Sequence, residues 1–209
     1  MSLNNKELKS IAQIFTNALE YAAERLSEIS SNKVCISDTS LKMIHSDDIP
    51  LLFGNNQDII SGTYLEFNVR EDTSENSIPF NGQMLLSFPI ESAYRLAAIL
   101  LQDLTVPLNK MQSMTNSIFG ELGNIFGTGF LTFLANVAEI RLLPSVPYVI
   151  NYKATPILEF VKDKLGEKNC TLLMMQTKLE MEKQPIEGHF LLITKDYQNV
   201  IKFLDKMPV

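Results

Sequence analysis

The chain has 209 residues and a net charge of −6, and its 45% hydrophobic and 20% charged residues are typical of a soluble globular protein. It has no cluster of Lys and Arg, so nucleic acid is not expected as a partner. No stretch approaches 18 uninterrupted apolar residues and the first ten residues do not resemble a secretory signal, so we expect a cytoplasmic protein without a membrane span.

The first hundred residues are predicted to form a helix, three strands and a second helix. Residues 5–31 repeat apolar side chains at helical spacing. Alternating or continuous apolar runs predict the three strands, and stretches rich in turn formers separate them. The strands are expected at 32–44, 62–71 and 83–90, the loops at 45–58 and 72–82, and the second helix at 91–104.

After Pro107 the same order begins again. A long helix is predicted over 109–137, and Pro156 suits the first turn of a shorter one at 155–166. The remaining elements are strands at 139–152, 169–182 and 188–195 and a closing helix at 196–207.

The two halves align with an offset of about 106–108 residues, with "EGHFLLI" over "NGQMLLS". This indicates an internal duplication, with repeat 1 at 5–104 and repeat 2 at 108–206. Each half alone would leave a sheet edge and an apolar face open. We therefore expect one α/β domain over 1–209, a monomer with pseudo-two-fold symmetry. Its two long helices would lie on one side of a shared, six-stranded, mainly antiparallel sheet.

The decade "GELGNIFGTG" at 120–129 is unusual inside a predicted helix, because each of its four glycines costs about 1 kcal/mol relative to alanine. On a helical wheel Ser117, Glu121 and Asn124 form one narrow polar stripe. Three glycines lie directly beside this stripe, and their bare backbone predicts close approach by a partner. In the simpler alternative, another helix of the protein packs there while Glu121 and Asn124 are merely solvated. The glycines are Gly120, Gly123 and Gly127, and the core face holds Ile118, Leu122, Ile125, Phe126 and Phe133.

The pattern Ser117-x3-Glu121-x2-Asn124, followed after 22 residues by Pro147, resembles the motif of the CheC/CheX/FliY phosphatases of bacterial chemotaxis. That motif has Asp or Ser, then Glu, Asn and Pro at these spacings, and "ELGNIFGTG" also resembles the family wording around it. The repeated layout looks like CheC across nearly the whole chain. The resemblance implies hydrolysis of the aspartyl phosphate on a CheY-type response regulator.

The resemblance also implies a role for each motif residue. Asn124 would orient the attacking water, because an amide both donates and accepts hydrogen bonds. Glu121 would pair with a lysine of the receiver domain, and Ser117 would support the helix surface or contact the partner. Pro147 would shape the start of the strand behind the site. Mg²⁺ is expected on the receiver, so no cofactor or metal is expected on this chain.

The first half departs from the family pattern, because CheC often carries the motif twice. Counting back 108 residues from the four motif positions gives Lys9, Gln13, Thr16 and Thr39, and none of them matches. A glutamine cannot form the ion pair, and a threonine cannot replace the amide. We therefore expect one working site, in the second half.

Two other functional classes are left open by the sequence. One is a non-catalytic interaction module, such as a flagellar-switch protein related to the FliM middle domain. The other is an adaptor, such as one that binds the receptor deamidase CheD.

The remaining polar candidates are weaker. His45 and His189 lack metal-ligand spacing, Asp47 and Asp48 suit a loop start before Pro50, and two distant cysteines form no metal or disulfide motif.

Overall fold

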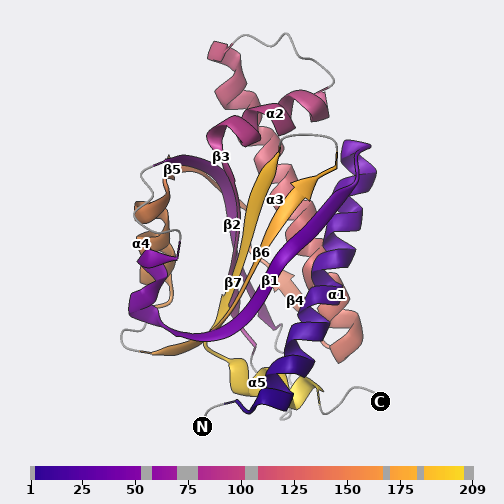
Figure 1. Cartoon of the computed structure of the whole chain (residues 1–209), viewed down its shortest axis with the longest axis vertical. Helices are drawn as coiled ribbons and strands as arrows, with labels where there is room; N and C mark the ends of the chain where they lie inside the picture. Colours follow the sequence, from indigo (N-terminus) through magenta and orange to yellow (C-terminus); the bar gives the residue numbers. More distant parts are fainter. Residues whose placement is uncertain are drawn as a thin grey trace.

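The computed structural model describes residues 3–52, 58–69, 80–101, 108–166, 170–182 and 186–204. It consists of one antiparallel sheet with helices on both faces (Figure 1). This is the α/β fold expected from the sequence. Most of the loop predicted at 72–82 lies outside the described residues.

The two longest helices pack side by side on one face of the sheet (Figure 1). The first begins at a capping box, in which the Asn4 side chain accepts hydrogen bonds from the backbone of Lys6 and Glu7. It ends at Ser30, and the capping residue Ser31 has a left-handed φ of 51°. The helices are α1 (Asn5–Ser30), α2 (Ile90–Leu101), α3 (Leu108–Ala138), α4 (Ala154–Lys164) and α5 (Tyr197–Leu204), with a 3₁₀ helix η1 (Ser46–Leu51).

The sheet has seven strands in the order β1-β6-β7-β3-β2-β4, and β5 also pairs with β2. All strand pairs are antiparallel. The strands are β1 (Val34–His45), β2 (Ile59–Val69), β3 (Gly82–Pro89), β4 (Leu142–Pro144), β5 (Tyr148–Lys153), β6 (Thr171–Met181) and β7 (Glu187–Thr194).

The prediction of six strands is wrong by one, because the strand expected at 139–152 is split in two. Glu139 has a φ of 53°, and regular pairing starts only at Leu142. The segment 145–147 then interrupts the ladder, where Pro147 has no N–H to donate. The backbone N–H of Ser145 still donates to Glu66 of β2, so both pieces follow the same neighbour.

Strand pairing is symmetric about the central β3–β7 pair. β1 pairs with β6 as β5 pairs with β2, and the hairpins β2–β3 and β6–β7 occupy matching places. The helices show a matching relation, because every buried position of α1 is also buried in α3 at a shift of 108 residues. Repeat boundaries at 5–104 and 108–206 stay a prediction.

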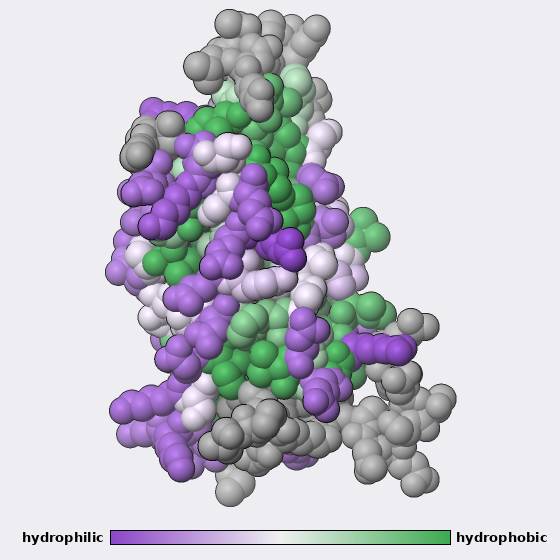
Figure 2. Space-filling model, turned by 90° about the vertical axis from the view of Figure 1, so that its right-hand side faces the viewer, coloured by the Kyte–Doolittle hydropathy of each residue, from purple (hydrophilic) through white to green (hydrophobic). Residues whose placement is uncertain are grey.

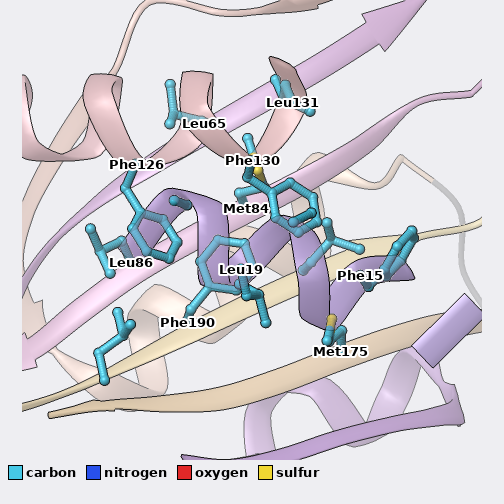
Figure 3. Packing of buried hydrophobic residues seen from close by; sticks show 14 of the residues in the cluster. Phe15, Leu19, Leu65, Met84, Leu86, Phe126, Phe130, Leu131, Met175 and Phe190 are labelled. Atoms are coloured by element: carbon cyan, nitrogen blue, oxygen red, sulfur yellow. The ribbon is translucent and has the colours of Figure 1, made fainter. Parts of the chain in front are cut away.

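Two hydrophobic cores lie on opposite faces of the sheet. The larger one joins α1 and α3 to the sheet, with Phe15, Phe126, Phe130 and Phe190 at its centre (Figure 3). Their rings make edge and tilted contacts at centroid distances of 5.2–5.9 Å. The smaller one lies between the sheet, η1 and α4. By length and composition Met114–Ala138 could cross a membrane, and half of its most apolar 18-residue stretch is buried inside the molecule. One helix of this kind is weak evidence for a membrane span.

Candidate functional site

The predicted polar stripe lies on the outer surface of α3. Ser117, Glu121 and Asn124 are all exposed, whereas Leu122 and Phe126 of the same helix are buried. The hydroxyl of Thr128, one turn further on, donates a long hydrogen bond of 3.4 Å to Oδ1 of Asn124. The stripe is thus presented to solvent on a helix whose opposite face is anchored in the core.

The Glu121 carboxylate makes no ion pair with any described part of the chain. Its charge is therefore not neutralised by an internal cation among those residues. An exposed carboxylate of this kind can pair with a cation on another molecule.

The glycines beside the stripe pack against the protein's own sheet, and the expectation that a partner approaches there is wrong for two of them. A Cβ at Gly123 would overlap Cβ of Thr63 on β2, and a Cβ at Gly127 would lie 2.5 Å from Cδ1 of Leu65. The Thr63 hydroxyl also donates to the carbonyl of Phe119 on α3. Gly123 and Gly127 therefore let the helix approach β2 more closely than a side chain would permit.

Gly120 differs, because a Cβ at this position would meet only Cγ2 of Val149, at 3.6 Å. Val149 belongs to β5, which runs beside this part of α3. Pro147 is half-buried just before β5, at the break in the strand. Pro147 thus lies at the start of the strand that borders α3, and its role in shaping that strand stays a prediction.

Asn124 also borders a hollow of about 270 Å³ between the two long helices, which we call the α1/α3 groove. Figure 2 views the molecule from the side on which α1 lies in Figure 1, and it shows polar side chains interleaved with apolar patches. The groove is lined by Tyr21 and Arg25 from α1 and by Asn124, Ile125, Thr128, Gly129 and Thr132 from α3.

Tyr21 and Arg25 were not identified from the sequence. The Arg25 guanidinium donates a 2.8 Å hydrogen bond to the Tyr21 hydroxyl and lies 5.2 Å from the centre of that ring. It also pairs with Glu28 at 3.6 Å. These contacts, the tyrosine hydrogen bond foremost, raise the pKa of Arg25. Spacing along α1 shows that Tyr21 and Arg25 share a face, but only the pairing of α1 with α3 reveals that they lie near Asn124.

The positions of α1 that correspond to Glu121 and Asn124 are Gln13 and Thr16. Gln13 is exposed and donates a hydrogen bond of 2.9 Å to Asn17, and Thr16 is half-buried. The 108-residue shift in burial aligns these two residues with Glu121 and Asn124. The first half thus presents no carboxylate–amide pair at the aligned positions.

Other polar candidates have structural partners. The His45 ring accepts a hydrogen bond from the backbone of Asp47 at the start of η1, and Asp47 pairs with Lys162 at 2.5 Å. Lys162 lowers the pKa of Asp47. His189 lies in β7, where burial lowers its pKa. Within the described residues no group of three or more His, Cys, Asp and Glu side chains could hold a metal ion.

No known family model matches the sequence, and no curated protein matches it. Solved structures do match. FliY from Thermotoga maritima superimposes with a TM-score of 0.70 at 16% identity, covering 99% of this chain and 100% of that one. The FliM–SpeE complex from H. pylori gives 0.64 at 11% identity, covering 99% and 100%.

A chain of the CheX–CheY complex with BeF₃ and Mg²⁺ from Borrelia burgdorferi gives a TM-score of 0.51 at 15% identity, covering 87% of this chain and 95% of that one. At identities this low, structural similarity establishes the fold only, and the chemistry must be inferred from the residues of the site. The chain has the CheC-like fold shared by FliY, CheX and the FliM middle domain.

Proposed function

We propose that this protein is a cytoplasmic phosphatase that hydrolyses the aspartyl phosphate of a CheY-type receiver domain and so terminates its signal. The observation that carries the proposal is the Glu121–Asn124 pair, exposed together on one face of a firmly packed helix in a CheC-like fold.

The proposed reaction requires little chemistry from this chain. An oxygen of water bonds to phosphorus while the bond from phosphorus to the aspartate oxygen breaks, and the carboxylate leaves with the electron pair. The water's protons remain with inorganic phosphate or pass to solvent. The main task is to hold the water in line with the breaking bond, which favours positioning over covalent catalysis.

Asn124 suits this task because its amide can accept a hydrogen bond from water and donate one to a phosphoryl oxygen. Its long contact with Thr128 is weak, so the amide can exchange it for contacts with the receiver. The anchored face of α3 fixes the backbone from which the side chain extends. Rigid support of this kind makes an oriented polar group effective in a transition state.

Glu121 is proposed to dock the receiver by pairing with a lysine beside its phosphorylation site. Mg²⁺ would be carried by the receiver. The CheX–CheY complex with BeF₃ and Mg²⁺ supports this docking, because a protein of similar fold is bound to CheY there.

The direct experiment charges receiver domains from the same genome with acetyl phosphate, removes the excess reagent and follows phosphate release. The wild-type protein should accelerate release from at least one receiver, because it supplies an oriented water. The matched control is the Glu121→Ala, Asn124→Ala double variant, whose exposed substitutions should leave folding unchanged. Equal rates with both proteins for every receiver would refute the proposal.

A second candidate is a non-catalytic interaction module, such as a switch component or CheD-binding adaptor. The observations that favour it are the FliM match and three exposed apolar side chains near β5, Val146, Tyr148 and Tyr152, which are 60–87% accessible. This alternative predicts stable binding of a receiver or another protein without faster loss of phosphate.

A further inference from the structure

We propose that Arg25, on the helix opposite the motif, binds the phosphoryl group whose hydrolysis Asn124 assists. The inference rests on the proposed function and adds a phosphate-binding residue to its site. Arg25 exchanges no proton or electron pair in the reaction. The bonds that form and break are those of the proposed hydrolysis.

The groove places a cation beside the amide. Arg25 and Asn124 line the same hollow, and Arg25 is the one charged side chain among the described residues that line it. A Cβ at Gly129 would make ordinary contacts of 3.6 Å with Cγ of Arg25 and 3.4 Å with Cα of Ala22, so α1 packs directly on α3 at this point. The stem of Arg25 therefore lies against the same stretch of α3 that carries Asn124 and Thr128.

The guanidinium is held by neighbours that leave donors available. Tyr21 accepts one hydrogen bond and stacks below the charge, and Glu28 forms a surface ion pair. A guanidinium has five N–H donors, so these contacts leave several for an anion. Arg25 and Glu28 are 49% and 69% accessible, and an ion pair this exposed contributes little and is easily exchanged.

A phosphoryl group in transfer spreads negative charge over its three equatorial oxygens, and a positioned arginine stabilises that charge. Glu28 is the carboxylate that pairs with Arg25 in the described part of the chain, and this exposed contact can be exchanged for a phosphoryl group, which accepts charge-assisted hydrogen bonds from a guanidinium in bidentate fashion. Among the described residues that line the groove the one charged side chain is this cation, which favours an anionic ligand.

The arginine and tyrosine that line the groove on α1 have no counterparts at the aligned positions of α3. The 108-residue shift that relates the buried faces of α1 and α3 places Gly129 and Phe133 at the positions of Tyr21 and Arg25. Neither of these side chains has a donor for a phosphoryl oxygen. Arg25 of the first half thus lines the groove together with Asn124 of the second half, whereas the aligned position of α3 has no cation.

The test compares Arg25→Gln and Arg25→Lys with Lys42→Gln. The last variant also removes one positive charge, but Lys42 alternates with Leu41 and Met43, which pack on the α1/α3 side of the sheet, so it lies on the far side. We expect Arg25→Gln to lower kcat/KM for the phosphorylated receiver by about 10- to 100-fold, and Arg25→Lys to recover only part of the loss. Lys42→Gln should stay within about twofold of wild type.

A second measurement separates this inference from the proposed function. Affinity for a receiver charged with BeF₃ and Mg²⁺ should fall about tenfold in Arg25→Gln, while affinity for the uncharged receiver should change less than twofold. If Asn124→Ala is inactive but Arg25→Gln matches Lys42→Gln in both assays, the role of Arg25 is wrong and the phosphatase stands. If wild type shows no turnover, the phosphatase is wrong, and the BeF₃-dependent loss of binding still decides whether Arg25 recognises the phosphoryl group.

Discussion

Replacing Gly120, Gly123 and Gly127 of α3 one at a time by alanine should give three different stabilities, although the helix and the substitution are the same. In an open helix each replacement would stabilise the protein by about 1 kcal/mol, since glycine is the poorer helix former. The neighbours of each new methyl group decide how much of this gain survives.

At Gly120 the methyl group would meet only Val149 at an ordinary 3.6 Å, so the full gain should appear, with a rise in Tm of roughly 2–4 °C for a domain of this size. At Gly127 it would meet the end of the flexible Leu65 side chain at 2.5 Å, and the gain and the cost should nearly cancel. At Gly123 it would overlap Cβ of Thr63, an atom fixed to the strand backbone. Overpacking of this kind costs about 1–3 kcal/mol against the gain of about 1 kcal/mol, so Gly123→Ala should be destabilising by up to roughly 2 kcal/mol.

Urea unfolding followed by circular dichroism measures the three free energies. A double-mutant cycle with Thr63→Gly identifies the cause, because the penalty of Gly123→Ala should disappear once the opposing Cβ is absent. A Gly123→Ala protein at least as stable as Gly120→Ala would show that α3 does not lie against β2 as described. The folded fraction of Gly123→Ala should keep its phosphatase activity, since that flank faces the sheet.

Three further predictions concern the helix surfaces and β7. Gln13→Ala combined with Thr16→Ala should leave the rate of receiver dephosphorylation within about twofold of wild type, because neither side chain can do the proposed chemistry; a large loss in the folded variant would show that the first half also works. Glu121→Ala should weaken both receiver binding, measured by titration, and turnover, and an unchanged dissociation constant would remove its docking role. His189 has a pKa below its ordinary 6.5 because of burial and the nearby Lys178, so the unfolded chain takes up this proton first and the free energy of unfolding should fall between about pH 7 and pH 5. His189→Gln should flatten that decline in denaturant titrations, and an unaltered slope would contradict it.

The sequence predicted the elements and the exposed stripe because both depend on local periodicity. The 3.6-residue repeat places Ser117, Glu121 and Asn124 together on any straight helix, and the structure shows them exposed. The break between β4 and β5 was missed because the apolar pattern of 139–152 continues through it. The signals available were Pro144 and Pro147, which restrict ladder pairing.

The role of the glycine flank and the presence of Arg25 could not be read from local pattern. A helical wheel gives the direction of Gly123 but not its neighbour, and Thr63 lies 60 residues earlier on a strand. Arg25 likewise comes beside Asn124 only through the packing of α1 on α3. Both depend on contacts between elements distant in sequence.

The central claim is that the Asn124 amide orients the attacking water, and single-turnover loss of labelled phosphate from a receiver tests it most directly. Asn124→Ala should slow that step by roughly 10²–10³-fold, the scale for loss of one oriented polar group from a transition state. Binding of the BeF₃-charged receiver should change little, and Asn17→Ala, which removes an amide from α1, should match wild type. An Asn124→Ala protein that releases phosphate as fast as wild type would contradict the phosphatase mechanism.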